Sequence, residues 1–285
     1  MAEFAADQAD GLRKLLAKDF VRILALTSSG AGVGKSTAVL NLAAALALAG
    51  RKVMVLDENG SLCRRLGIEG ARDLLDAAEG ASLDELLVGG PAGISILQAA
   101  RRGEGLEGGE RLIERISEVG RPFDVVLVDT VPGSPGHLLS LSRSAQEMIV
   151  VLSTEGSSIT DAYALIKMMN LNHGKRHFRI LVNRAKTEEE ARAVYDNMAK
   201  VARRYLAITL DYMGHVPQDD ALRQASRLGD AVVQAFPLSA PSTRFRAMAD
   251  DILGWPHPQQ NEISLGEFLR HLIRSSRLSA ADIRA

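Results

Sequence analysis

The sequence contains a single cysteine, Cys63, among its 285 residues. One thiol cannot build an internal disulfide framework, and it cannot supply the several ligands that an iron–sulfur cluster needs within one chain. We therefore exclude an electron-transferring iron protein of the nitrogenase type, and we expect Cys63 to be a small, partly buried thiol.

Long apolar runs and an excess of one charge are also missing. No stretch has 18 consecutive apolar residues, and residues 1 to 20 lack the apolar core of a secretory signal. Lys and Arg number 34 against 35 Asp and Glu, so the net charge is -1 and bulk charge indicates no sequence-independent binding to nucleic acid. We expect a cytoplasmic protein that is not integral to the membrane.

Short β-rich runs alternate with segments of helical length. Several runs are apolar almost throughout, which is typical of parallel strands covered by helices on both faces. The pattern predicts an α/β fold with a doubly wound, mostly parallel sheet. The predicted strands lie at residues 21 to 27, 52 to 57, 94 to 99, 123 to 129, 147 to 153 and 178 to 183.

Two segments fall outside this alternation. The pattern of residues 1 to 20 predicts a helix. The stretch "GWPHPQQNE" at 254 to 262 contains Pro and Gln and is typical of a linker. A second amphipathic segment follows at 263 to 285. We therefore predict one central domain over 21 to 253, with a helical element at each end.

The stretch "SSGAGVGKST", residues 28 to 37, has the features of a phosphate-binding loop. Gly34, Lys35 and Ser36 match the end of the general pattern, although Ser29 stands where the pattern has its first Gly. A strand precedes the loop and a helix follows, so backbone N–H groups at the helix start can converge on an anion. Lys35 is expected to reach the β and γ phosphates and Ser36 the Mg²⁺; a Gly-rich turn before an ordinary helix is the alternative.

Two aspartates end predicted strands, Asp57 after "KVMVL" and Asp129 after "FDVVLV". Ligands of open α/β sheets bind at the carboxyl ends of the strands, and an aspartate there holds Mg²⁺ in P-loop proteins. We predict a metal site from Ser36, Asp57 and Asp129. Either aspartate alone could instead cap the helix that follows it.

These motifs resemble those of the MinD/ParA class of deviant Walker P-loop ATPases over about residues 20 to 253. The resemblance rests on the loop, on "VMVLDEN", on "VVLVDTVPG" and on "TEGSSITDAYALIKMM". Within that class, "SITDAYALIK" and "LDYMGHVPQDDALRQA" are similar to the FlhG (FleN) regulators of flagellar number and placement.

The resemblance implies a homodimer that holds ATP and Mg²⁺ between two subunits. It implies that Lys35, Asn59 and Asp129 are the catalytic positions, and that Asn183 reads the adenine edge while Pro217 and Asp219 cover the base. The nucleotide-binding set is then Gly30, Gly32, Val33, Gly34, Lys35, Ser36, Thr37, Asn183, Pro217 and Asp219.

At two positions the sequence departs from the family pattern. Gly30 stands where the family has a lysine that reaches across the dimer to the partner's phosphates, and Asn59 stands where it has an aspartate that positions the attacking water. A charge supplied in trans raises the rate about 10³- to 10⁵-fold in GTPases, and an amide cannot accept a proton as a carboxylate can. We therefore expect ATP to be bound and hydrolysed weakly or not at all.

The N-terminal segment "DQADGLRKL", residues 7 to 15, is similar to an element with which FlhG proteins stimulate FlhF, a signal-recognition-type GTPase. The resemblance gives this role to Asp7, Gln8, Leu12 and Arg13. Without it, the segment would be an ordinary amphipathic helix packed on its own domain.

The C-terminal segment carries one apolar helical stripe with arginines on its other faces. Such a helix after a linker suits reversible binding to an anionic inner membrane, and a dimer would present two copies. The alternative is a helix folded back onto the domain. The stripe consists of Leu265, Phe268, Leu269, Leu272 and Ile273.

The leading hypothesis is an FlhG-like regulator that acts from the cytoplasm, peripherally on the inner face of the cell membrane and at a cell pole, with flagellar switch or transcriptional regulators as further partners. One alternative is a non-hydrolysing scaffold that uses only its terminal helices. Another is a ParA-type partitioning ATPase, which needs a massed basic surface. The basic pairs here, such as residues 64 to 65 and 203 to 204, are scattered, so we expect no direct nucleic-acid binding.

Overall fold

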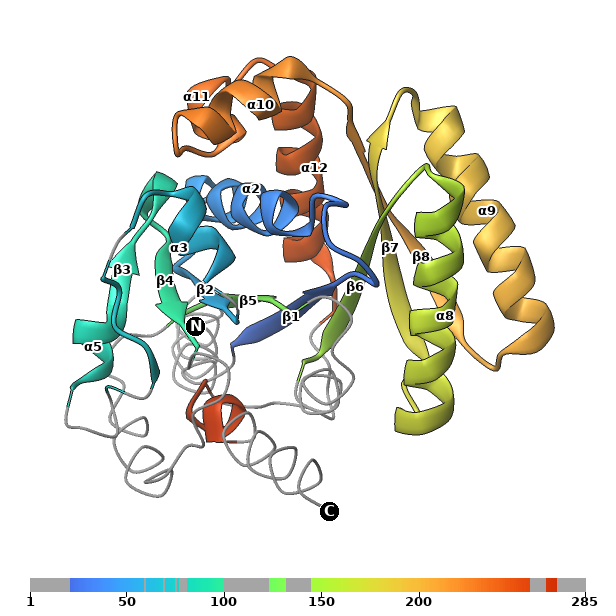
Figure 1. Ribbon diagram of the computed structural model, residues 1–285, viewed down its shortest axis with the longest axis horizontal. Helices are drawn as coiled ribbons and strands as arrows, with labels where there is room; N and C mark the ends of the chain where they lie inside the picture. Colours follow the sequence, from blue (N-terminus) through green and yellow to red (C-terminus); the bar gives the residue numbers. More distant parts are fainter. Residues whose placement is uncertain are drawn as a thin grey trace, which may run out of the picture.

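An eight-stranded sheet forms the centre of the molecule (Figure 1). The computed structural model describes residues 21–58, 60–68, 70–74, 76, 81–99, 123–131, 145–256 and 265–270. The strand order is β3-β4-β2-β5-β1-β6-β7-β8, and every neighbouring pair is parallel except β3 with β4. The predicted doubly wound, mostly parallel sheet is confirmed.

All six predicted strands are present, and two further strands were not predicted. β3 has only three residues and β8 contains Asp211, Gly214 and His215, so neither has the near-continuous apolar run of a central parallel strand. Both lie at the edges of the sheet, where one side of the strand has no partner strand among the described residues. The strands are β1 Arg22–Thr27, β2 Val53–Asp57, β3 Leu87–Gly89, β4 Ser95–Gln98, β5 Val125–Asp129, β6 Glu147–Ser153, β7 His177–Ala185 and β8 Thr209–Pro217.

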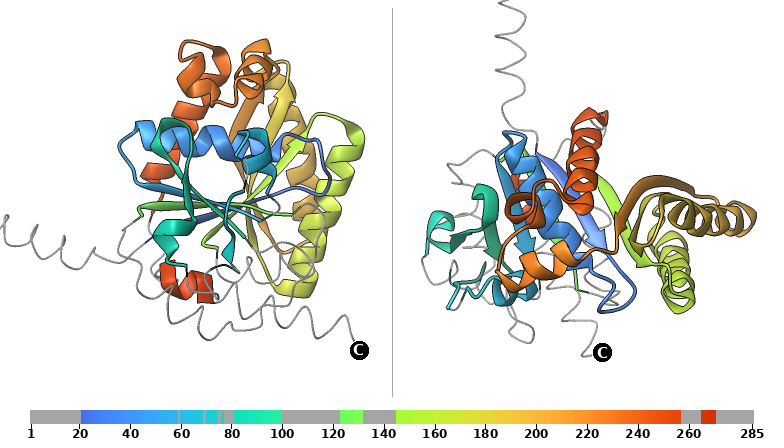
Figure 2. Two further views of the ribbon diagram at one scale, coloured as in Figure 1. Left: turned by 60° about the vertical axis from the view of Figure 1, so that its left-hand side comes forward. Right: turned by 90° about the horizontal axis from the view of Figure 1, so that it is seen from above.

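Helices cover both faces of the sheet (Figure 2). The face with α2 (Lys35–Leu48) also carries α3 (Ser61–Arg65), α10 (Asp220–Arg227), α11 (Val232–Ala235) and α12 (Ala240–Gly254). The opposite face carries α8 (Gly156–His173) and α9 (Glu188–Tyr205). Two short elements, α5 (Leu83–Leu86) and the 3₁₀ turn η1 (Pro91–Gly93), flank β3.

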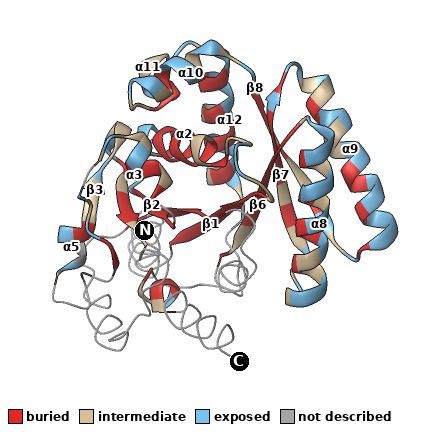
Figure 3. Ribbon diagram, in the orientation of Figure 1, coloured by how far each residue is buried: buried red, intermediate tan, exposed pale blue. Residues whose placement is uncertain are grey.

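The core lies in two layers, one on each side of the sheet. Successive residues of each central strand point to opposite faces, so that Ile23 and Ala25 belong to one layer and Leu24 and Leu26 to the other. Figure 3 shows the result as buried strands between helices whose outer sides are exposed. Each fully buried Leu or Ile contributes about 1.5–3 kcal/mol relative to an exposed one, so an apolar strand is stable only between two such layers.

Strand register brings the carboxyl ends of β1, β2 and β5 to one edge. Leu26 lies opposite Asp129, and Asp57 lies opposite the same Asp129 on the other side. The loop after β1 leads directly into α2. The topology therefore places the phosphate-binding loop beside the two aspartates, as the sequence predicts.

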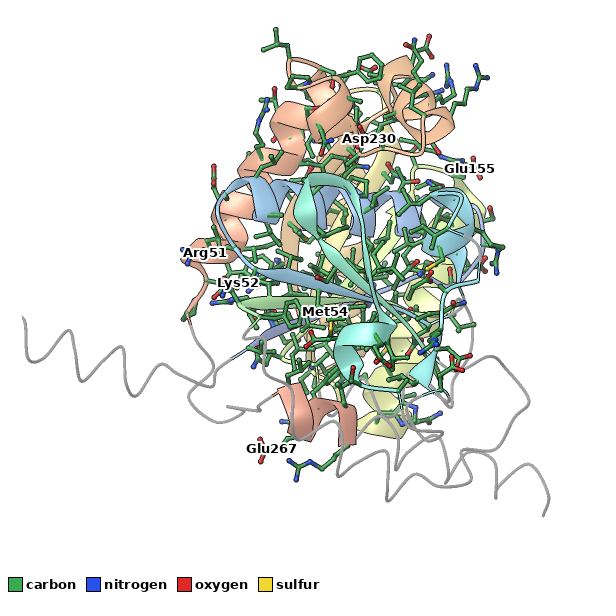
Figure 4. The ribbon with its side chains drawn as sticks, turned by 90° about the vertical axis from the view of Figure 1, so that its left-hand side faces the viewer. Arg51, Lys52, Met54, Glu155, Asp230 and Glu267 are labelled. Atoms are coloured by element: carbon green, nitrogen blue, oxygen red, sulfur yellow. The ribbon has the colours of Figure 1, made fainter. Side chains whose placement is uncertain are left out.

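Residues 265 to 270 form a helical turn on the same face of the sheet as α8 and α9, and their apolar side chains are buried in the core layer of that face. Leu265 is 8% exposed, while Phe268 and Leu269 are fully buried. The exposed Glu267 points outward from the same turn, away from the sheet strand that carries Met54 (Figure 4). For these residues the structure shows the folded-back arrangement; Leu272 and Ile273 lie outside the described residues, as does the segment 1 to 20.

No helix in the described part of the chain is long and apolar enough to cross a membrane.

Cys63 is a free, buried thiol, and burial raises its pKa to about 11. The expectation of a buried thiol is therefore confirmed.

Candidate nucleotide-binding site

Two glycines shape the loop between β1 and α2. Gly32 and Gly34 have φ angles of 84° and 89°, in the left-handed region that favours glycine. A Cβ on Gly34 would lie 2.1 Å from Asn183 Nδ2, so a side chain at this position would meet β7. The close approach brings the loop against the end of β7, which lies two strands along the sheet from β1. Asn183 Nδ2 also donates to the Val33 carbonyl at 2.7 Å.

A buried ion pair lies under the loop. Lys35, at the start of α2, is 4% exposed and its ammonium donates to Asp129, which is fully buried at the end of β5. The Ser61 hydroxyl donates to the other Asp129 oxygen at 2.9 Å and lies 3.0 Å from the Ser36 hydroxyl. Hydrogen bonds thus link the loop lysine, the loop serine and β5 through a residue of α3.

Asp57 caps α3 in this structure. Its carboxylate accepts backbone N–H groups of Ser61 at 3.0 Å, Leu62 at 2.9 Å and Cys63 at 3.1 Å. Burial raises the pKa of Asp57, and the three N–H bonds oppose that change. The helix-capping alternative therefore holds for Asp57. Among the described residues, Asp129 bonds to side chains from the loop and α3, and the segment from residue 132 that it could cap lies outside them.

Glu58 is a buried acid of the site that our sequence reasoning missed. It is 8% exposed, and Oε2 accepts the Val131 N–H at 2.9 Å, which ties the end of β2 to the segment after β5. Burial raises the pKa of Glu58 to about 7, although the positive charge of Lys35 opposes the shift. Its position next to Asp57 was the available signal, but Glu is rarely buried and a strand-end Glu usually faces solvent.

The residues predicted to hold the base lie around one pocket of about 500 Å³ beside the loop. Asn183, at the end of β7, and Pro217, at the end of β8, line it together with Asp219. Asp219 also caps α10 by accepting the Ala221 N–H at 2.7 Å. Gly34 and Thr37 form the loop side of the same pocket. The fold therefore brings loop residues and the residues predicted to contact the base, which are far apart in the sequence, to one pocket.

Comparison with known proteins shows the family of the chain. Residues 24–232 match the CobQ/CobB/MinD/ParA nucleotide binding domain. The chain belongs to this family.

Relatives and solved structures agree with the family assignment. The antiactivator FleN of Pseudomonas aeruginosa is 37% identical over 265 residues, covering 89% of this chain and 94% of that protein. The flagellum site-determining protein YlxH of Helicobacter pylori is 29% identical and covers 83% and 82%. The MinD cell division protein of Aquifex aeolicus superposes with a TM-score of 0.66 at 26% identity, covering 84% of this chain and 99% of that one.

Within this nucleotide-binding family, the present chain has a basic pocket wall that our sequence reasoning did not identify. The charged residues that line the pocket are four arginines and one aspartate, Asp219. The arginines come from α3, the end of β7 and α10. Because these elements are far apart in the sequence, no local sequence pattern predicts that the four arginines share a pocket. The arginines are Arg65, Arg184, Arg223 and Arg227.

The described residues fit a bound polyphosphate better than a free-standing metal site. The loop glycines turn the backbone at the start of α2, and Lys35 is a buried cation beside them. Among the described residues, no group of three or more His, Cys, Asp or Glu could hold a metal ion by itself. Ser36, Asp57 and Asp129 remain the candidate Mg²⁺ residues, with phosphate oxygens as the further ligands expected in P-loop sites. Asn59 lies outside the described residues, and Gly30 does not line the pocket.

The contrast between two loop glycines gives a direct test of the site. Gly34→Ala should weaken ATP binding at least about tenfold, because the new Cβ meets Asn183 and φ is unfavourable for alanine. Gly30→Ala is the matched control, since Gly30, although in the predicted nucleotide-binding set, does not line the pocket and a Cβ there has nothing within 4 Å. Titration with fluorescent ATP measures both variants, and equal loss of affinity in the two would refute the assignment of this pocket.

Proposed function

We propose that this chain binds adenine nucleotide with Mg²⁺ and acts as an FlhG-type regulator of flagellar number and placement. The observation that carries the proposal is the 37% identity to the antiactivator FleN, which extends over 94% of that protein. A flagellum site-determining protein among the relatives supports the same role. The geometry of the loop supports a second part of the proposal, that a bound nucleotide controls this regulator.

The nucleotide would be held by residues of both halves of the sheet. Residues 32 to 37 would cradle the phosphates, while Asn183, Pro217 and Asp219 would contact the base. Mg²⁺ near Ser36, Asp57 and Asp129 would neutralise phosphate charge. Asp129 already holds the Lys35 ammonium, so phosphate has to compete with a buried carboxylate for the same cation.

We further propose that hydrolysis is slow. Gly30 provides no cation for a partner's phosphates, and Asn59 provides no carboxylate for the attacking water. The role of position 30 requires an ATP-dependent homodimer, which is the arrangement we propose for the active form. The scaffold alternative rests on the same observation at Gly30, and it differs in predicting that nucleotide affinity has no influence on partner binding.

FlhF is the proposed partner of the N-terminal segment, through Asp7, Gln8, Leu12 and Arg13. Deleting residues 1 to 18 should abolish stimulation of FlhF GTP hydrolysis, because the working residues are removed while the described domain begins at residue 21. The rate of phosphate release from FlhF, with and without the added chain, measures the effect. The Gln8→Ala, Arg13→Ala variant should reproduce the deletion, and unchanged stimulation by either protein would refute the assignment.

Peripheral membrane binding by the C-terminal segment is the last part of the proposal. Leu265, Phe268 and Leu269 are buried against the domain, so contact with lipid requires their release. Release exposes apolar surface that lipid can then cover, with each nearby basic residue adding about 1 kcal/mol at an anionic surface.

Co-sedimentation with vesicles tests this part. The full chain with Mg²⁺ and ATP should sediment several-fold more with anionic vesicles than with neutral ones, and deletion of residues 263 to 285 should abolish the difference. Glu267→Ala is the control on the same turn, because this side chain is exposed and lies off the apolar stripe. Absence of sedimentation in every nucleotide state would leave the segment as a folded-back part of the domain.

A further inference from the structure

Arg65 is placed at the phosphate loop by a short, firmly held helix. It is the last residue of α3, whose first turn is fixed by the Asp57 carboxylate through three backbone N–H bonds. Gly60 before the helix has φ 66°, and a Cβ there would lie 2.6 Å from Gln98 Nε2, so the entry into α3 is tightly constrained. Contacts with β2 and β4 therefore fix the start of the helix that carries Arg65.

The Arg65 guanidinium contacts the start of α2. Its Nη1 donates to the Thr37 hydroxyl, and the side chain lines the same pocket as Gly34 and Thr37. Thr37 follows the loop lysine by two residues. The guanidinium therefore lies where the loop passes into the helix, at the point toward which the helix directs its partial positive charge.

This cation keeps unused bonding capacity. Burial lowers the pKa of Arg65 and the nearby Asp129 raises it, yet a guanidinium stays charged in proteins. Asp129 is already engaged by Lys35 and Ser61. In the part of the chain that the structure describes, no carboxylate forms an ion pair with Arg65, whose hydrogen bond to Thr37 uses one of five N–H donors.

The other arginines of the pocket are placed differently. Arg184 is exposed and donates to the Gly32 carbonyl at 2.6 Å, and Arg223 forms an ion pair with Asp220 of its own helix. Arg227 is exposed at the outer end of α10. Arg65 is therefore the pocket arginine that combines partial burial with direct contact to the loop helix.

We propose that Arg65 binds the polyphosphate of the nucleotide within one subunit and supplies positive charge that the loop lacks at Gly30. The inference rests on the proposed nucleotide-binding function and extends it to a residue outside the loop. A planar guanidinium can donate two parallel hydrogen bonds to phosphate oxygens, whereas a lysine acts as a point charge. Affinity for ATP would then depend little on a cation from a partner subunit.

Calorimetric titration of the full chain with ATP and ADP, each with Mg²⁺, and with adenosine tests the proposal. Arg65→Ala should weaken ATP and ADP binding about ten- to hundredfold, the range expected for hydrogen bonds between charged groups. Adenosine affinity should be unchanged because it has no phosphate. Arg65→Lys should recover part of the loss, and Arg64→Ala, an exposed neighbour that does not line the pocket, should bind like the wild type.

Three results would overturn the proposal, and a fourth would overturn the function on which it rests. The Arg65 assignment fails if Arg65→Ala binds ATP as the wild type does, or if Arg65→Lys is as weak as Arg65→Ala. It also fails if Arg65→Ala weakens the binding of ATP and of adenosine equally and lowers the unfolding temperature of the protein, since that indicates a structural role. Failure of the wild type to bind ATP at all would instead contradict the proposed nucleotide-binding function.

Discussion

The buried ion pair between Lys35 and Asp129 is the interaction on which the rest of the site depends. Both side chains are almost fully removed from water, so each charge needs the other, and removing one partner of such a pair typically costs about 3–5 kcal/mol. The pair joins α2 to β5, and Ser61 extends it to α3. The loop, the strand ends and the helix that carries Arg65 therefore form one connected unit.

The same ion pair suggests how the proposed nucleotide would change the site. Lys35 is the expected phosphate ligand, and it is held by a carboxylate that is itself an expected metal ligand. If a bound phosphate took the ammonium, Asp129 would keep the Ser61 hydroxyl as a partner and would have one carboxylate oxygen available as a ligand for Mg²⁺. When phosphate binds, this one exchange would change the contacts of α3 and of β5 at the same time. The neighbouring arginines make the pocket favourable for an anion before that exchange occurs.

The sequence predicts those parts of this molecule that depend on local pattern. Apolar runs identify the six buried strands, and the glycines of residues 28 to 37 identify the loop. The edge strands β3 and β8 carry polar or glycine residues and have weaker patterns.

The parts that sequence reasoning missed depend on tertiary contacts. Ser61, Glu58 and Arg65 join the site only because α3 and the ends of β2 and β5 converge, which no spacing in the sequence reveals. The C-terminal stripe shows the same limit. Amphipathicity predicts its apolar face, but only the packing of Phe268 and Leu269 shows what that face contacts.

In the proposed function, the chain retains the residues that hold ATP and lacks those that hydrolyse it rapidly. Single-turnover hydrolysis by the wild type beside the Gly30→Lys, Asn59→Asp double variant tests it most directly, with bound ATP quantified in the same samples. Gly30 has space for a side chain, so the variant should fold. We predict that both proteins bind one ATP per chain and that the double variant hydrolyses it at least about tenfold faster. Equal rates in the two proteins, or a wild type that binds no ATP, would refute the proposed function.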